Sequence, residues 1–351
     1  MLKPIPHSQP WLTPADREAV SAVLSSRMLA AGPLVKKFEE EMSRYLGAAG
    51  GVATSSGTDA LFLALKALGI GRGDEVILPT YVCRSVWDAV AAAGATPVLC
   101  DISDAWCMSA ETVERRLSAR SKAVIVVHTF GVAAEATTIR RCGLPLIEDC
   151  CQALGARGNG AAAGAVGDCC VLSFHATKLL TTGEGGMLLA RDPRLLERAR
   201  ALKGGGPGLA VRYRQPMSDL AAALGLSQLG AYEASLRRRR EIADFYFRKL
   251  EGLPVRLPAA VRPRSIFFRF PLRVSGGDFE EIRRAFEREG IHVRRGVDAL
   301  LHRECGLRAE DFLVAEQTFA ETVSIPLYPS LTDEDCARVV AACCKIFGGR
   351  E

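Results

Sequence analysis

Several short motifs that mark large enzyme classes are missing from this sequence. It has no GxxxxGKS/T phosphate loop, no GxGxxG after a predicted strand, no HExxH and no GxSxG. Nucleotide hydrolysis, a standard dinucleotide-binding fold and zinc-dependent hydrolysis therefore lose their usual support. The five histidines lack metal-ligand spacing, and no two C-x-x-C units face each other among the twelve cysteines, so we expect no metal site.

A strong excess of charge is missing too. Lys and Arg number 45 against 40 Asp and Glu, a net charge of +5 over 351 residues. Such a weak bias argues against a nucleic-acid partner, although it is compatible with a local basic pocket for an anionic ligand. The four arginines 237–240 are followed by apolar residues at helical spacing, so we interpret them as a solvated helix face.

Long hydrophobic runs are absent as well. No stretch approaches the roughly eighteen uninterrupted apolar residues of a membrane-spanning helix, so we expect no membrane association. The N-terminal string MLKPIPHSQPWLTPADREAV lacks the apolar segment of a secretory signal, which makes the cytoplasm the expected compartment.

What the chain does contain is the pattern of an α/β protein. Hydrophobic residues make up 48% and charged residues 24% of the sequence, which allows a large core in about two domains. Between residues 50 and 190, short apolar runs alternate with helical patterns over 58–69 and 109–120. We expect a mostly parallel sheet, whose ligand would lie beyond the carboxyl ends of the strands. The predicted strands span residues 75–79, 96–102, 123–130, 144–150, 169–176 and 186–191.

The remainder of the chain has a different organisation. A GGGPG string (204–208) predicts a flexible joint, and a helical pattern then runs from about Ser218 to Leu250. Beyond it, patterns of strand, helix and strand, followed by a closing helix, predict a small α+β unit. We place a domain boundary after residue 235, between a large domain with an N-terminal arm (1–235) and a small C-terminal domain (236–351). The three patterns cover residues 265–274, 278–290 and 291–295.

Polar residues at three predicted strand ends could carry chemistry. The string TSSGTDALFLALKALG places Gly57 and Thr58 at the start of an apolar helix, where free N–H groups and the helix dipole favour a phosphate. Asp149, with Glu148 before it, ends a very apolar strand, and Lys178 follows the next one among Ser, Thr and Gly. Taken singly, each has a simpler explanation: a helix N-cap for the first two features and a surface lysine for the third.

Taken together, the three features match the requirements of pyridoxal phosphate (PLP). The helix start would hold the phosphate, the aspartate would keep the pyridine nitrogen protonated, and the lysine would form the Schiff base. A lysine in a confined pocket loses its charge more easily, and this makes its amine nucleophilic.

The same strings resemble the DegT/DnrJ/EryC1/StrS family of PLP-dependent sugar aminotransferases. The resemblance rests on SFHATKLLTTGEGG, LIEDCCQALGA and SSGTDALFLALKALGIGRGDEVILPTY, and it continues over 30–42, 128–131, 217–229 and 324–335. It covers nearly the whole chain, in order. It implies an α/β, type I PLP-dependent aminotransferase fold, with a large mostly parallel mixed-sheet domain and a smaller C-terminal α+β domain. It also implies a homodimer with active sites at the subunit interface.

The resemblance assigns roles to individual residues. Lys178 matches the Schiff-base lysine, Asp149 the partner of the pyridine nitrogen, and Gln152 the residue that hydrogen-bonds the ring hydroxyl of the cofactor. Tyr81 falls where the family places an aromatic side chain that stacks on the ring, although a core tyrosine is the simpler explanation. The expected phosphate ligands are Gly57, Thr58 and Ser173.

Two features depart from the family pattern: the stretch near SIFFRFP lacks a histidine often seen there, and one position before the MS segment is changed. The family usually has an asparagine three residues before the Met of the MS segment, and that asparagine reaches the cofactor phosphate of the neighbouring subunit. Here the position is Arg214. We expect Arg214, with Arg212 nearby, to bind a phosphate of the cofactor or of a nucleotide-sugar.

These residues predict a ping-pong aminotransferase. L-glutamate or glutamine would give up its amino group, and a keto group of a nucleotide-linked sugar would receive it, with Lys178 as nucleophile and general base. Amination of a cyclitol or related cyclic ketone stays open. A PLP- or PMP-dependent sugar dehydratase is less favoured, because that branch has His in place of the lysine. A non-catalytic regulator is least favoured, because the set of site residues is intact.

Overall fold

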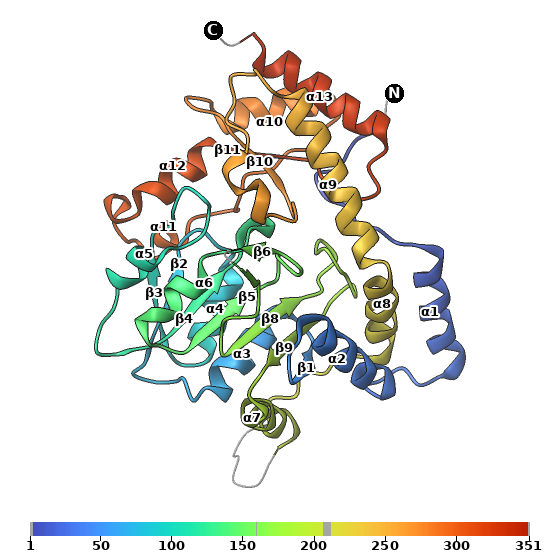
Figure 1. The fold of residues 1–351 in the computed structure, drawn as a ribbon, viewed down its shortest axis with the longest axis vertical. Coiled ribbons are helices and arrows are strands. Elements are labelled where there is room, and N and C mark those ends of the chain that lie inside the picture. Colours follow the sequence, from blue (N-terminus) through green and yellow to red (C-terminus); the bar gives the residue numbers. More distant parts are fainter. Residues whose placement is uncertain (1–2, 159, 206–211, 350–351) are drawn as a thin grey trace.

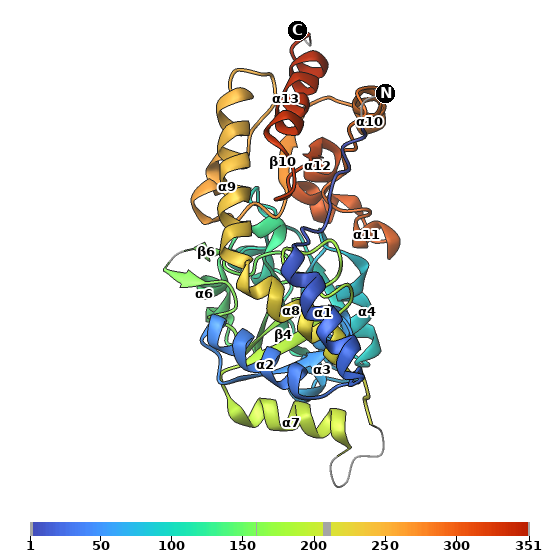
Figure 2. The same ribbon diagram turned by 90° about the vertical axis from the view of Figure 1, so that its right-hand side faces the viewer.

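The computed structural model describes residues 3–158, 160–205 and 212–349. Its centre is a seven-stranded sheet with helices on both faces, and a smaller unit lies at one end of the long axis (Figures 1 and 2). Strand β9 is antiparallel to both of its neighbours, and the other paired strands are parallel. In sheet order the strands are β1 (Gly50–Thr54), β9 (Gly186–Ala190), β8 (Cys169–Ser173), β5 (Leu146–Asp149), β4 (Ser121–Val127), β2 (Glu75–Pro79) and β3 (Thr96–Cys100).

Alternation along the strands explains why both faces are covered. In β2, Val76 and Leu78 pack into one apolar cluster, whereas Ile77 between them packs into another on the opposite face. The first face is covered by α3 (Gly57–Ala67), α4 (Arg84–Ala92) and α7 (Pro193–Gly204). The second is covered by α2 (Pro33–Leu46), α5 (Ala110–Glu114), α6 (Ala136–Ile139) and α8 (Asp219–Gly230), and α1 (Pro14–Ser26) packs on α8.

The smaller unit has an apolar cluster of its own. A two-stranded antiparallel sheet pairs β10 (Phe270–Arg273) with β11 (Thr322–Ile325). Around it lie α9 (Tyr232–Lys249), α10 (Phe279–Arg288) and α13 (Asp333–Phe347). The N-terminal arm joins this cluster, because Ile5 pairs with Ile291. The boundary after residue 235 stays a prediction. The remaining short elements are β6 (Arg157–Gly158), β7 (Ala161–Ala162), α11 (Leu301–Glu304) and α12 (Leu313–Glu321).

The α/β class and the six predicted strands are confirmed, but some elements differ from expectation. Strand β1 went unpredicted, because GGVAT has two glycines and little apolar signal. The expected single helix over 218–250 is two helices, which are separated by one turn residue, Ala231 (φ −95°, ψ 0°). The expected strand 291–295 forms only isolated bridges. Residues 206–208 of the predicted joint lie outside the described residues.

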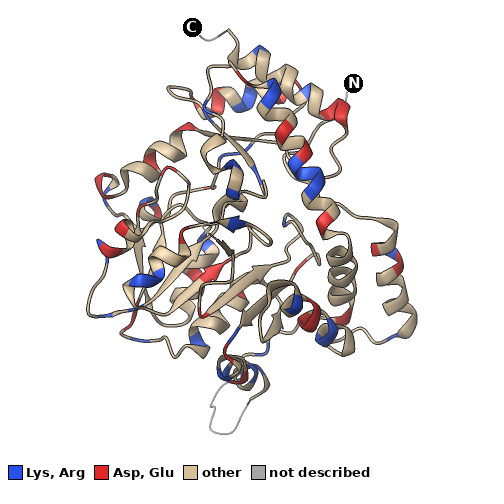
Figure 3. Ribbon diagram, in the orientation of Figure 1, with Lys and Arg blue, Asp and Glu red and all other residues tan. Residues whose placement is uncertain are grey.

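Charged residues are scattered over the described parts of the chain, with both signs interspersed (Figure 3). The interpretation of the four arginines on α9 as a solvated face is wrong for Arg239, which is 5% exposed. Its Nη1 donates to the carbonyl oxygens of Phe267 (3.2 Å), Phe268 (3.3 Å) and Leu327 (3.1 Å). Burial lowers the pKa of Arg239 to about 10. No helix in the described residues is long and apolar enough to cross a membrane.

Candidate active site

The start of α3 lies against the ends of two strands. In the sheet register, Gly186 of β9 lies opposite Thr54 of β1 and Ser173 of β8. A Cβ atom on Gly186 would come within 2.1 Å of the Ser56 carbonyl oxygen, and one on Gly57 within 2.7 Å of Ser173 Cβ. Glycine at both positions therefore allows the helix start to approach the strand ends this closely.

This helix start can accept an anion. The simpler explanation, an N-cap, is present, because Ser56 Oγ accepts from Asp59 N at 3.1 Å. The cap leaves the N–H groups of Gly57 and Thr58, which have no acceptor in the described parts of the chain. Together with the helix dipole and the neighbouring Ser173 hydroxyl, these N–H groups form a seat suited to a phosphate.

Strand β5 ends in two carboxylates with different surroundings. Glu148 is completely buried, and His128 Nε2 donates to it at 2.9 Å. His128 Nδ1 accepts from Ala134 N, which leaves the ring proton on Nε2. Burial opposes ionisation of Glu148, but these hydrogen bonds outweigh it and lower the pKa of the carboxyl. Three backbone N–H groups also donate to Glu148, those of Gly164, Val166 and Gly167.

Asp149 has no comparable set of partners. It is 7% exposed, and its Oδ1 accepts from Cys151 N at 2.9 Å. No ion-pair partner lies near it in the described residues. A buried carboxylate is costly unless it meets a cation or several donors. Asp149 therefore offers a place for a positively charged group of a ligand.

Lys178 lies in the loop that follows β8. The loop turns back on itself, and Lys178 N donates to the His175 carbonyl at 2.9 Å. The half-buried Lys178 side chain reaches the Phe268 ring, with Nζ 5.6 Å from the ring centroid. Ser173 and Cys151 line a small cavity with Lys178. No carboxylate pairs with Lys178 among the described residues, so its amine is available for chemistry.

Two cysteines lie within the influence of both Asp149 and Lys178. Desolvation raises the pKa of the Cys83 thiol and of the Cys151 thiol. The Asp149 carboxylate adds to each rise, and the Lys178 ammonium opposes it. Asp149 and Lys178 are therefore both close enough to these two thiols to influence them, and Lys178 and Cys151 line one cavity. Sequence reasoning missed both cysteines as site residues; Cys151 could have been found from its place beside Asp149, whereas Cys83 carries no such signal.

Gln152 is oriented by a backbone contact. Its Oε1 accepts from Phe130 N at 2.9 Å. The amide Nε2 group therefore points the other way and can donate to a ligand. This orientation suits the predicted hydrogen bond to a ring hydroxyl.

Tyr81 lies in the core, and its predicted stacking on the cofactor ring stays a prediction. It is completely buried, edge-on to Phe130 with 6.1 Å between the ring centroids. A Cβ atom on Gly296 would come within 1.9 Å of its hydroxyl oxygen. Burial raises the pKa of Tyr81 to about 12. These surroundings suit the simpler explanation of a core tyrosine. Cys83, two residues further along the chain, is the residue whose pKa is affected by Asp149 and Lys178.

Arg214 is not brought to the other predicted residues within this chain. Its side chain is exposed and has no hydrogen-bond or ion-pair partner in the described residues. Arg212 donates from Nε and Nη2 to the Gly204 carbonyl, at 2.9 and 2.7 Å.

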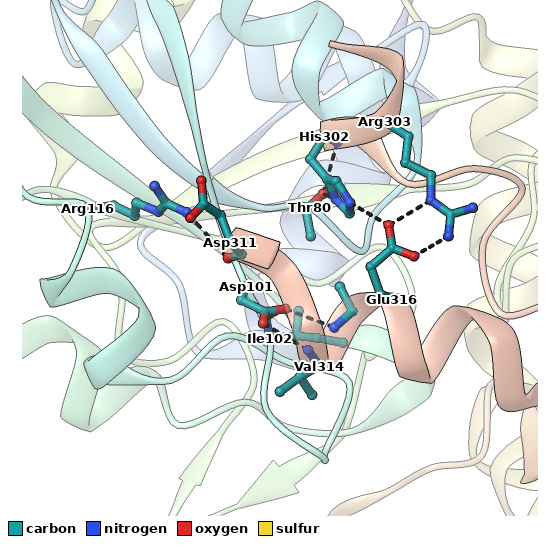
Figure 4. Close-up of polar contacts among 10 residues, drawn as sticks. Thr80, Asp101, Ile102, Arg116, His302, Arg303, Asp311, Val314 and Glu316 are labelled. Carbon is teal, nitrogen blue, oxygen red and sulfur yellow. Dashed lines mark hydrogen bonds and ion pairs between the residues drawn. The ribbon is translucent and has the colours of Figure 1, made fainter. Parts of the chain in front are cut away.

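A second polar cluster fastens the C-terminal part of the chain to the sheet (Figure 4). His302 lies between Thr80 and Glu316, with 2.8 Å contacts to both, and Arg303 also donates to Glu316. Asp101 accepts from Val314 N at 3.0 Å, at the start of α12. A cavity of about 590 Å³ lies beside Asp101 and Val314, and none of the predicted site residues line it. These groups satisfy one another, so we interpret the cluster as structural.

The geometry can hold a ligand with three distinct ends. The start of α3 can bind a phosphate, and Asp149 can pair with a protonated ring nitrogen. The amine of Lys178 can attack a carbonyl carbon. The residues that define this site lie at or just after the carboxyl ends of β1, β5 and β8.

Comparison with known proteins identifies the class of enzyme that this arrangement belongs to. Residues 11–343 match the DegT/DnrJ/EryC1/StrS aminotransferase family. The chain belongs to this family and is an aminotransferase, as the resemblance predicts. GDP-perosamine synthase of Caulobacter vibrioides is 31% identical over 95% of this chain and 95% of that protein.

Solved structures share the fold over nearly the whole chain. The aminotransferase TlmJ from Streptoalloteichus hindustanus has a TM-score of 0.91 and 34% sequence identity, covering 97% of this chain and 98% of that one. Spr1654 of Streptococcus pneumoniae, solved in its PLP form, has a TM-score of 0.90 and 26% identity, with 98% of each chain covered. The predicted fold class is confirmed.

Proposed function

We propose that this enzyme is a PLP-dependent aminotransferase that moves an amino group from L-glutamate or glutamine to a keto group of a nucleotide-linked sugar. Family membership supports the reaction, and the name of the Caulobacter relative, GDP-perosamine synthase, supports the substrate class. The observation that carries the proposal is what gathers at the carboxyl ends of β1, β5 and β8. Within the described residues, the N–H groups at the start of α3 have no acceptor, buried Asp149 has no ion-pair partner and Lys178 has no carboxylate partner.

The residues present fit PLP. Gly57, Thr58 and Ser173 would hold its phosphate. Glycine at positions 57 and 186 lets the helix start approach the strand ends, because a Cβ atom there would collide with Ser173 or with the Ser56 carbonyl. Bound PLP would supply an electron sink for bond changes at the α-carbon of the donor. Asp149 would hold the ring nitrogen in its protonated form, and Gln152 Nε2 would donate to the ring hydroxyl.

Lys178 would move the proton in both half-reactions. No carboxylate holds its Nζ in an ion pair in the described residues, so this nitrogen is available to form the Schiff base. Once the donor has displaced it, Nζ would take the proton from the donor α-carbon. It would then give a proton to the carbon on the other side of the reacting nitrogen. In the second half-reaction, the same atom would run these transfers in reverse.

We also propose that the site is completed across a homodimer. Arg214 is exposed and free to reach the phosphate held by a partner subunit. Large apolar side chains that a partner could cover are exposed around α1: Leu12, Leu24, Met28 and Leu29. The cytoplasmic location stays a prediction.

An absorption spectrum of the purified protein tests the central proposal. PLP bound to Lys178 should give a visible band that falls when L-glutamate is added and returns with a keto-sugar nucleotide. Loss of the band with L-glutamate but return only with a cyclitol ketone would favour the cyclic-ketone alternative. A protein that binds no PLP even after reconstitution would overturn the proposal.

A further inference from the structure

An arginine from the small unit reaches the same aromatic ring as Lys178. Arg269 Cζ lies 5.8 Å from the centroid of the Phe268 ring, and Lys178 Nζ lies 5.6 Å from that centroid. The charges of Asp149 and Lys178 both affect the pKa of the Cys83 thiol, and Cys83 is also close enough to Arg269 to interact with it electrostatically. Arg269 therefore belongs to the surroundings of the predicted active site, although no motif marks it.

Only part of the Arg269 guanidinium is bonded. Nη1 donates to the carbonyl oxygens of Arg295 and Gly296, at 3.0 and 2.9 Å. Nε and Nη2 have no acceptor, and no carboxylate lies within ion-pair distance, in the described residues. Burial, followed by the charge of Arg294, lowers the pKa of Arg269, although Tyr81 and the more distant Asp298 carboxylate oppose this shift. A half-buried guanidinium without a counter-ion is unfavourable, and an anionic ligand would relieve it.

The backbone that carries Arg269 is held rigidly. Phe267 has a left-handed backbone (φ 54°), a strained conformation for a residue with a bulky side chain. Buried Arg239 binds the carbonyls of Phe267 and Phe268. On the other side, a Cβ atom on Gly131 would come within 2.8 Å of Phe268 N. Strain that the surroundings enforce in this way is typical of functional sites.

We propose that Arg269 binds a carboxylate group of the amino donor while the amino group of that donor reacts at the Lys178 position. This inference rests on the proposed function. The free N–H groups of a guanidinium form a fork that matches a carboxylate. The carboxylates of an amino acid lie a few bonds from its reacting nitrogen, whereas the diphosphate of a sugar nucleotide is separated from the keto carbon by the sugar ring. Arg269 shares its aromatic ring with Lys178, so the donor is the better match.

Binding of glutarate to the PLP-loaded enzyme tests the assignment without turnover, because glutarate carries the carboxylates of glutamate but no amino group. Calorimetric titration should show a Kd about 10- to 100-fold weaker in Arg269→Gln than in wild type. Arg269→Lys keeps the charge but not the fork and should lie between them. The matched control is Arg294→Gln, which removes a nearby exposed charge and should stay within about twofold. The same titration with a nucleoside diphosphate should be unchanged in all variants.

Three results would overturn the proposal. The first is wild-type enzyme that binds PLP but no glutarate. The second is an Arg269→Gln enzyme that binds glutarate normally and a nucleoside diphosphate weakly, which would assign Arg269 to the acceptor. The third is unchanged binding of both ligands with a lower melting temperature, which would make Arg269 an anchor for the 295–296 carbonyls only. A wild-type protein that fails to bind PLP would instead contradict the proposed function itself. If Arg269→Gln does not fold, Arg269→Lys carries the test.

Discussion

The two sides of the active site are built by different means. On the sheet side, Asp149 ends a regular strand and Gly57 and Lys178 follow two others, so their positions depend on short local strings. On the opposite side, Phe268 and Arg269 lie on a segment that precedes β10 and has little regular structure. That segment is positioned by contacts from distant parts of the chain. The cofactor side can therefore be inferred from sequence, whereas the substrate side needs the three-dimensional structure.

The largest effect should come from Lys178 on the sheet side. Lys178→Ala removes the nucleophile and base together, so transamination should fall by at least about 10⁴-fold. Lys249→Ala, at the exposed end of α9, is the matched control and should keep wild-type turnover. Steady-state kinetics with L-glutamate and a keto-sugar nucleotide would measure both. Turnover retained in Lys178→Ala would remove this residue from the mechanism.

A smaller loss of rate is expected at Asp149. Asp149→Asn keeps the shape of the side chain but loses the negative charge that would hold the ring nitrogen protonated. Turnover should fall by about 10²- to 10³-fold, while the melting temperature stays close to that of wild type. Kinetics and thermal unfolding of the PLP-loaded protein would check this. A large loss of stability with normal turnover would show that Asp149 is structural.

For Glu148, the neighbouring carboxylate, we expect a loss of stability with little change in turnover. Glu148→Gln loses charge-assisted hydrogen bonds from His128 and three backbone N–H groups, so the free energy of unfolding should fall by about 2–3 kcal/mol. Turnover should change little. Urea unfolding of both proteins at pH 7 would give the difference.

The pH dependence of that difference follows from the lowered pKa of Glu148. A carboxyl with a folded pKa below its unfolded value of 4.5 stabilises the fold above that value. This contribution is lost as the pH falls through the folded pKa. The gap between wild type and Glu148→Gln should therefore be full at neutral pH and narrow below about pH 4.5. A gap that is independent of pH would contradict the assignment.

These residues also show how far sequence reasoning extends. The strand-end positions of Asp149 and Lys178 could be predicted, because apolar runs followed by polar residues mark the carboxyl ends of buried strands. Tyr81 could not be placed, since only the contact with Gly296 shows that its hydroxyl points into the core. The positions of Arg239 and Arg269 could not be predicted either, because they also depend on contacts with distant residues. Their neighbours lie 26 to 88 residues away in the chain.

The smallest effect is expected at Arg214, which we propose belongs to a third side of the active site, the one that a partner subunit supplies. If Arg214 reaches a phosphate in the partner subunit, Arg214→Ala removes one charge-assisted contact among several, so PLP affinity or the KM of the nucleotide-sugar should weaken by about tenfold. Arg248→Ala removes an exposed arginine near the end of α9 and serves as the control. Retention of PLP during gel filtration and the KM of the acceptor would be measured in both variants. Because loss of PLP would point to the cofactor phosphate and a raised KM to the nucleotide, the two readouts separate the two phosphates. If neither readout moved in Arg214→Ala, Arg214 would have no part in either site.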